Sequence, residues 1–274
     1  MQSVEVAASW PVENVAVAVV SSPDGVVGTL GDQERVFPLA SVTKLLTSYA
    51  VLVAVEEGAV EWDQPCGPAG STVRHLIAHT AGYAFDKPEA QAAPGTRRIY
   101  SNAGFDVLAS FVGEACEMPF ATYLHEAVFA PLGMKSSALV GSAGAGAESS
   151  AADLALFAAE LLSPRLVSPE LVAEATSVVF PGLNGVLPGY GMQKPNDWGL
   201  GFEIRSTKSP HWTGNSSSPR TFGHFGQSGT FLWVDPEISA ACVALTDLRF
   251  GPWAVEAWTP FSDGVRAELV SRRA

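Results

Sequence analysis

Short apolar runs typical of β-strands lie at both ends of the chain, and apolar residues at helical spacing fill its middle. The first run, Val15–Val20, is β-branched, and the turn sequence 22–25 follows it, so residues 26–30 are expected to pair back as a hairpin. After Trp198 strand patterns return. The predicted later strands are residues 199–204, 230–234 and 239–246, with a turn at 235–237.

Helical spacing begins just after the first hairpin. An apolar helix is predicted over residues 42–57, with Gly58 at its end. A closing helix is predicted over 253–269, although Pro260 falls inside it. Further helices are predicted at residues 72–78, 102–114, 119–128 and 151–162.

This order of elements predicts an α/β (α+β) fold. An antiparallel sheet built from both termini and flanked by helices would form one domain from residues 1–60 and 185–274. Residues 61–184 would form a mostly helical subdomain. The chain contains no internal repeat, and the Ala/Gly/Ser-rich stretch 141–152 is interpreted as a loop.

Composition indicates a folded enzyme-sized protein and excludes several partners. Of 274 residues, 47% are hydrophobic and 16% are charged, which argues against disorder. The net charge of -12 leaves no basic footprint for nucleic acid. No apolar run is long enough for a membrane span.

Cysteines and the N-terminus suggest a cytoplasmic location. The three cysteines, Cys66, Cys116 and Cys242, share no metal-ligand spacing, and an odd number argues against a disulfide framework. Cys242 lies in an apolar run and is expected in the core. The first 14 residues contain no Lys or Arg and therefore lack the charged region of a signal peptide, unless a leader had been removed.

The first candidate chemistry is Ser41-Val42-Thr43-Lys44. A serine hydroxyl needs a nearby base or cation to become a nucleophile, and residues three apart on a helix share a face. Ser41 also falls at the predicted helix start, where free N–H groups favour developing negative charge. The alternative is an N-cap serine with a solvated lysine, but a lone lysine on so apolar a helix must snorkel or be paired.

Two further short motifs follow in the chain. Tyr100-Ser101-Asn102 offers a phenol that can act as acid or base and an amide that can both donate and accept. His224-Phe225-Gly226 precedes a predicted strand, and its glycine would let a substrate lie against the backbone. Taken singly, the first could be a turn with a capping asparagine and the second a glycine-rich turn.

In this order the motifs resemble those of class C β-lactamases, D-Ala-D-Ala carboxypeptidases and the esterases of the same superfamily, the penicillin-binding serine hydrolases. The likeness continues in Leu76–Gly82, Pro94–Gly104, Pro131–Met134 and Leu232–Pro236, and covers about residues 37–246.

The resemblance implies a role for each motif residue. Ser41 would form an acyl-enzyme, activated by Lys44, while Tyr100 would relay the proton as a phenolate held by nearby positive charge. Asn102 would bind the substrate amide and orient Lys44, and His224 would supply positive charge to the site. The backbone N–H groups of Ser41 and Gln227 would form the oxyanion hole beside Gly226. The resemblance implies no metal or organic cofactor.

Departures from the family pattern shift the expected substrate. Phe225 and Gln227 stand where peptidases and β-lactamases usually carry small hydroxyl residues that hold a substrate carboxylate. The chain is also short and shows no export signal. The predicted activity is therefore cleavage of small ester, amide or D-amino-acid-type substrates rather than efficient β-lactam hydrolysis.

Other interpretations stay open on the sequence alone. The chain could be a catalytically silent relative that uses the fold as a binding or scaffolding module. His75 and His79 could share a helix face as metal ligands, but Leu76 stands where a zincin has glutamate, and no third ligand is evident. The residues Trp198, Phe202 and Tyr83 could line a pocket or pack in the core.

Overall fold

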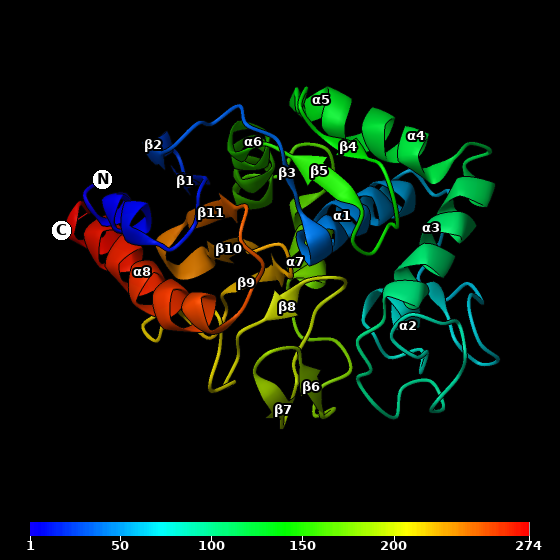
Figure 1. Ribbon diagram of the computed structural model, residues 1–274. Coiled ribbons are helices and arrows are strands. Elements are labelled where there is room, and N and C mark those ends of the chain that lie inside the picture. Colours follow the sequence, from blue (N-terminus) through cyan, green and yellow to red (C-terminus); the bar gives the residue numbers. More distant parts are fainter. Residues whose placement is uncertain (274) are drawn as a thin grey trace.

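A six-stranded antiparallel sheet forms the centre of the computed structural model, which describes residues 1–273 (Figure 1). Strand β1 pairs with β11 from Val15 opposite Thr246 to Ser21 opposite Ala240, so the two ends of the chain build one sheet. The predicted fold class is confirmed. In spatial order the strands are β2 (Gly25–Leu30), β1 (Val15–Ser21), β11 (Ala240–Thr246), β10 (Thr230–Asp235), β9 (Phe222–Gly226) and β8 (Glu203–Ile204).

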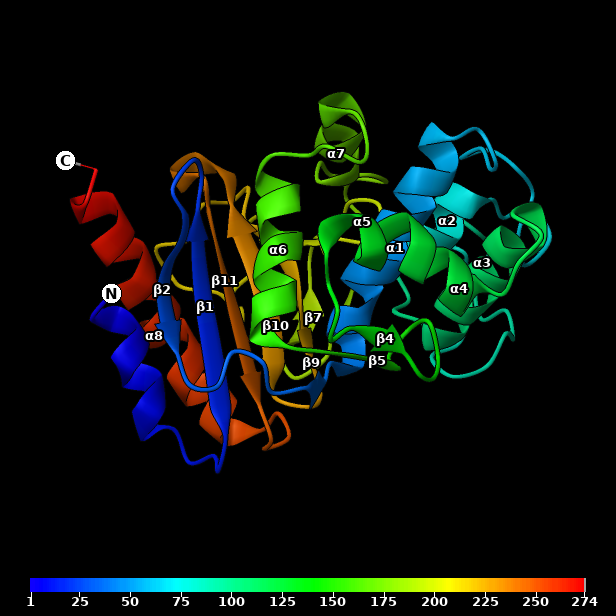
Figure 2. The same cartoon turned by 90° about the horizontal axis from the view of Figure 1, so that it is seen from above.

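Helices cover both faces of this sheet. The last helix, α8 (Pro252–Ser271), and the N-terminal turn η1 (Ser3–Ser9) lie on one face, and α6 (Ala151–Leu162) lies on the other (Figure 2). Successive residues of a strand point to opposite faces. In β1 they pack into two separate hydrophobic cores, one on each face of the sheet. This explains why the whole strand is apolar and does not alternate between apolar and polar residues.

A group of helices lies beside the sheet around α1 (Thr43–Glu56) (Figure 1). Every residue from Thr43 to Ala54 is buried, so α1 has no solvent face. Within residues 1–273, no helix is both long and apolar enough to cross a membrane. The other helices are α2 (Val73–Ile77), α3 (Asn102–Ala115), α4 (Phe120–Leu124), η3 (His125–Phe129), α5 (Ala130–Leu132) and α7 (Pro169–Ala175).

Smaller elements connect these layers. The turn η2 (Ala40–Val42) leads into α1, and η4 (Pro236–Ile238) joins β10 to β11. The short strands are β3 (Phe37–Pro38), β5 (Ala147–Ser149) and β4 (Ala138–Leu139) in one sheet, and β6 (Gly185–Leu187) and β7 (Gly191–Gln193) in a hairpin.

Two local predictions differ from the structure. The strand predicted over residues 199–204 is limited to β8, and the His224-Phe225-Gly226 segment, for which a glycine-rich turn was the alternative interpretation, is itself part of strand β9. Glycine serves close packing here, because a Cβ on Gly223 would lie 2.0 Å from the Leu232 carbonyl oxygen of β10. The helix predicted at the C-terminus continues through Pro260.

Helix α6 joins the two parts of the chain. Its residues fall within the range predicted to form the helical subdomain, yet α6 packs on β1 and β11. The hydroxyl of Tyr49 on α1 also donates to Glu160 on α6 at 2.7 Å. The division at residues 60/61 and 184/185 stays a prediction.

Candidate active site

Ser41 lies in η2, at the point where the chain turns from β3 into α1. Its neighbours Leu39 and Val42 are fully buried and fix this turn in the core. Ala40 has a φ of 46°, a left-handed conformation that costs energy for a residue with a side chain and is concentrated at functional sites. The turn leaves Ser41 half-buried on the wall of a cavity of about 310 Å³.

Lys44 is completely buried beneath Ser41, one helical turn further along. Its Nζ donates to Asn102 Oδ1 and to the Gly144 carbonyl, each at 2.6 Å, and lies 4.5 Å from the centre of the Tyr100 ring. Burial lowers the pKa of Lys44 from 10.5 to about 7, although Asp106 and Asp86 oppose this change. A substantial fraction of Lys44 is therefore a neutral amine at neutral pH.

Tyr100 and His224 meet over the same cavity, with Tyr100 Oη 3.3 Å from His224 Nε2. The His224 Nδ1 lies 2.6 Å from the Phe225 carbonyl oxygen, which can only accept, so Nδ1 carries the proton. Burial lowers the pKa of His224 to about 3, and its Nε2 is then a free acceptor. The Tyr100 hydroxyl therefore donates to His224.

These contacts correct two expected charges. His224 was expected to bring positive charge, but burial keeps its imidazole neutral. Tyr100 was expected as a phenolate, but burial raises the pKa of its phenol, and the hydrogen bond with Ser41 lowers it only in part. The resting site thus contains a neutral phenol and a neutral imidazole, because the buried environment penalises charge on both.

Of the remaining motif residues, Asn102 and Gln227 line the same cavity and Gly226 packs beside the Ser41 turn. Asn102 begins α3 and accepts from Lys44, while its Nδ2 lies 3.5 Å from Asp86 Oδ1. The Gln227 side chain donates to the Phe250 carbonyl at 3.1 Å, which anchors the end of β9. Gly226 allows close packing, since a Cβ there would lie 2.2 Å from the Leu39 carbonyl oxygen next to the Ser41 turn.

Sequence reasoning missed several residues of the cavity wall. Glu203, Trp212 and Arg249 line it, and none of them belongs to a local motif. Trp198, considered as either pocket or core, lines the cavity with only 1% of its surface exposed, while Phe202 is fully buried in the core. Tyr83 does not line this cavity.

Glu203 is the centre of a buried polar cluster at the cavity wall. Its carboxylate accepts from Trp212 Nε1 at 2.7 Å and from His211 Nε2 at 3.0 Å, and it is paired with Lys208. Burial alone would raise the pKa of Glu203, but His211 and Lys208 hold it well below the usual range. Lys208 also donates to the Asp197 carbonyl at 2.6 Å. The cluster therefore fixes the Trp212 wall through satisfied hydrogen bonds.

The two histidines considered as metal ligands both make contacts within the protein. His79 Nδ1 accepts from the Ser101 backbone N–H at 3.2 Å, and the His79 ring packs against Tyr100 at 4.6 Å between centroids. His75 Nδ1 is hydrogen-bonded to Thr72 Oγ1 at 2.9 Å. His79 thereby helps to hold Tyr100 in place.

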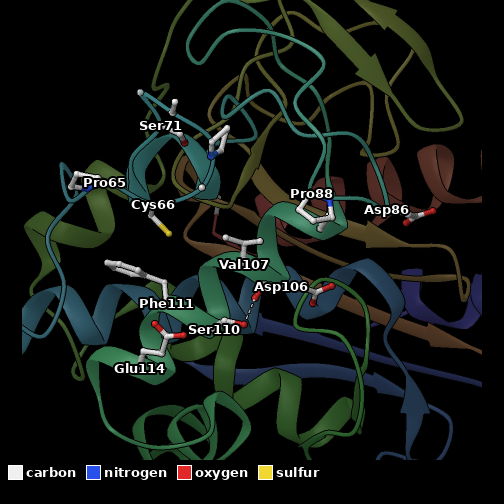
Figure 3. A pocket seen from close by; sticks show the side chains of 15 residues that line it. Pro65, Cys66, Ser71, Asp86, Pro88, Asp106, Val107, Ser110, Phe111 and Glu114 are labelled. Atoms are coloured by element: carbon white, nitrogen blue, oxygen red, sulfur yellow. Dashed lines mark hydrogen bonds between the residues drawn. The ribbon is translucent and has the colours of Figure 1, made fainter.

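A groove of about 630 Å³ lies along α3 (Figure 3). Asp86 and Asp106 lie toward one end of it, and Cys66 and Glu114 lie toward the other. Asp106 Oδ1 accepts from the Ala143 N–H at 2.9 Å, next to the Gly144 carbonyl that binds Lys44. The negative charges of both aspartates thus raise the pKa of Lys44, and Asp106 also holds the loop whose Gly144 carbonyl binds it.

The family model described as Beta-lactamase matches residues 12–261, and the chain belongs to this family, whose members are generally serine hydrolases. The sequence-based resemblance is confirmed. The chain is 58% identical to a β-lactamase from Mycobacterium bovis of known crystal structure, with a TM-score of 0.96 over 97% of this chain and 99% of that one.

More distant structures share the fold. The octameric penicillin-binding protein homologue from Pyrococcus abyssi is 19% identical, with a TM-score of 0.77 over 98% of this chain and 76% of that one. Simvastatin synthase from Aspergillus terreus is 16% identical, with a TM-score of 0.82 over 96% of each chain.

A curated relative matches a shorter part of the chain. The D-alanyl-D-alanine-carboxypeptidase/endopeptidase AmpH of Escherichia coli K12 is 26% identical over 38% of this chain and 37% of its own length. The chain therefore matches just over a third of that relative.

Proposed function

We propose that the protein is an acyl-transferring serine hydrolase that cleaves small esters or amides through an acyl-enzyme on Ser41. The observation that carries the proposal is the buried Lys44 amine, whose pKa is lowered to about 7. A neutral amine that donates two hydrogens, to Asn102 and Gly144, keeps one lone pair free. Such a group is a general base suited to neutral pH.

Acylation moves one proton from the nucleophile to the leaving group. Lys44 takes the Ser41 hydroxyl proton while Oγ attacks the substrate carbonyl, and the backbone N–H groups of Ser41 and Gln227 stabilise the oxyanion. As the tetrahedral intermediate collapses, the Tyr100 phenol protonates the leaving alcohol or amine. The Lys44 ammonium then returns a proton to Tyr100, and water releases the acyl group in the second half-reaction.

His224 and Asn102 position these groups. His224 Nε2 accepts from the Tyr100 hydroxyl and holds the phenol over the cavity. Asn102 accepts from Lys44 through Oδ1 and leaves its Nδ2 available to a substrate carbonyl and to Asp86. No step of this sequence uses a metal or an organic cofactor.

The substrate class follows from the cavity and from the relatives. A volume of about 310 Å³ walled by Trp198, Trp212 and Phe225 suits a small acyl compound. The relatives carry carboxypeptidase and β-lactamase names, which supports acyl transfer as the common reaction. Esters and D-amino-acid amides are therefore the first substrates to test.

Covalent labelling tests the proposal directly. A fluorophosphonate probe should add one label per chain to the wild type and none to Ser41→Ala, with the modified peptide located by mass spectrometry. A substrate panel of p-nitrophenyl esters, D-amino-acid amides and nitrocefin then identifies the reaction. Absence of labelling by fluorophosphonate, penicillin and the esters, in a protein whose circular dichroism shows a folded chain, would favour a silent binding module.

A further inference from the structure

A second cavity of about 620 Å³ continues from the candidate active site. Its lining shares Phe85, Tyr100 and Pro188 with the cavity of Ser41, so the two cavities adjoin at these three residues. The β6–β7 hairpin and the residues that lead up to Tyr100 form its walls. It contains neither Ser41 nor Asn102 nor Gln227, so it lies on the Tyr100 side of the site.

Three large, exposed apolar side chains lie at the rim of this second cavity. Phe85, Val186 and Met192 have 49%, 52% and 57% of their surfaces exposed, and all three line it. Large apolar side chains gathered at one exposed hollow mark a binding site more often than scattered ones do. The rim therefore fits an apolar portion of a ligand.

The same cavity has a strongly one-sided charge. Arg97 and Lys194 are exposed in its lining, and no aspartate or glutamate lines it. Within residues 1–273 neither cation forms an ion pair. The chain as a whole is acidic, with 28 acidic and 16 basic residues. A cavity lined by two unpaired cations and no carboxylate therefore differs in charge from the rest of the protein. This pattern favours an anion.

A third cation, Arg98, belongs to the scaffold of the cavity. Its guanidinium is buried and donates to the Val179 carbonyl at 2.8 Å and the Phe180 carbonyl at 3.1 Å, as well as to Ala78. These bonds fix the backbone of the segment that presents Arg97. They leave Arg97 and Lys194 as the cations able to meet a ligand.

We propose that this cavity binds the leaving-group portion of the substrate, and that this portion is an apolar alcohol or amine that ends in a carboxylate or another anionic group. The inference rests on the proposed function, in which Tyr100 protonates the leaving group. A substituent on the leaving atom then extends past Tyr100 into the adjoining cavity, with its body on the apolar rim and its charge at Arg97 and Lys194.

Two matched acetate esters test whether the protein prefers a substrate with an anionic leaving group. One is the acetate ester of 3-(4-hydroxyphenyl)propanoate, and the other is that of the corresponding neutral propanamide, so acyl group and phenol reactivity are alike. Wild type should show a kcat/KM ratio of about 5 to 30 in favour of the anion, as expected for two partly exposed charge contacts. The ratio should fall toward 1 in Arg97→Gln/Lys194→Gln and in 1 M NaCl.

Two single variants serve as controls for this ratio. Lys135→Gln removes an exposed cation that lies outside the cavity and should keep the wild-type ratio. Arg249→Gln removes the cation that lines the Ser41 cavity. A ratio near 1 in the wild type, or a preference lost in Arg249→Gln but kept in the double variant, would overturn the proposal.

Binding of the free phenols separates this inference from the catalytic one. On Ser41→Ala protein, isothermal titration should give a lower Kd for 3-(4-hydroxyphenyl)propanoate than for the propanamide, and the Arg97→Gln/Lys194→Gln changes should remove the difference. This measurement needs no turnover. Absence of Ser41 labelling with the binding difference present defeats only the proposed function. Labelling with equal Kd values defeats only the subsite.

A second copy of the chain is the competing occupant of the apolar rim. Light scattering of wild type and Met192→Gln distinguishes the two cases. A dimer that Met192→Gln abolishes while the substrate ratio stays at the wild-type value would assign the rim to self-association and contradict the subsite. A monomer in both, with weaker binding of the phenols to Met192→Gln, supports it.

Discussion

The Asp86→Asn substitution tests whether Lys44 is the base of the site. Asp86 raises the pKa of Lys44 by its negative charge, against the larger opposing effect of burial. Asparagine keeps an oxygen acceptor for the Asn102 amide but removes the charge. The pKa of Lys44 should fall, and acylation at acidic pH should become faster, because more of the amine is neutral.

The expected change in the pKa of Lys44 follows from the distance between the Asp86 carboxylate and the Lys44 amine. Asp86 Oδ1 lies 3.5 Å from Asn102 Nδ2, and Asn102 Oδ1 lies 2.6 Å from Lys44 Nζ. Across the amide the charges are about 8 Å apart, which gives about 0.5 kcal/mol in water and about 2 kcal/mol at an effective dielectric constant of about 20. The pKa of Lys44 should therefore fall by about 0.4 to 1.5.

The assay is the second-order rate constant for fluorophosphonate labelling between pH 5.5 and 8.5, which does not depend on deacylation. The wild-type rate should rise with pH through a midpoint near 7, and the Asp86→Asn midpoint should lie lower. In 1 M NaCl the difference should shrink. Glu256→Gln, an exposed change on α8, should leave the midpoint in place (Figure 1). An Asp86→Asn midpoint at or above the wild-type value would refute the reasoning.

Three other substitutions probe the buried groups. Lys44→Met should end labelling. As the pH rises from 7 to 10, the free energy of unfolding in urea should increase by about 3 to 4 kcal/mol more for the wild type than for Lys44→Met, because Lys44 stays protonated up to about pH 10.5 only in the unfolded chain. Parallel pH profiles of the two proteins would contradict this. Gly226→Ala should destabilise by about 1–3 kcal/mol through a clash with backbone, whereas Gly251→Ala, whose Cβ would meet no atom closer than 3.9 Å, should not. Glu203→Gln should destabilise by about 3–5 kcal/mol by leaving Lys208 buried without its counter-ion, and adding Lys208→Met should recover part of that loss.

The elements that sequence could predict are those with a strong local pattern. The β-branched run at β1 and the apolar helix α1 were found within a residue or two, because their burial is continuous. Strand β9 was missed since its glycines resemble a turn, and only pairing with β10 reveals their role. The β6–β7 hairpin has weak patterning and was missed as well.

The candidate site divides in a similar way. Ser41, Lys44 and Tyr100 were recognisable because each belongs to a short motif, and the structure brings them together. Glu203 and Arg249 reach the cavity only through tertiary packing, so no spacing along the chain identifies them. The Gly144 carbonyl is a backbone partner in a loop, and sequence gives no sign of its contact with Lys44.

Charge was the property that sequence predicted least well, and it decides the chemistry of the site. His224 was expected to bring a positive charge and Tyr100 to be a phenolate, yet burial drives Lys44, Tyr100 and His224 alike toward their neutral forms. The difference between 10.5 and about 7 for Lys44 corresponds to about 5 kcal/mol against the ammonium. In such a site the free lone pair belongs to the strongest base, the Lys44 amine, while the phenol keeps the proton that the leaving group needs. In the proposed mechanism the direction of proton transfer is therefore set by burial rather than by a fixed cation, and a substitution that admits water beside Lys44 should slow acylation at neutral pH even where every motif residue is intact.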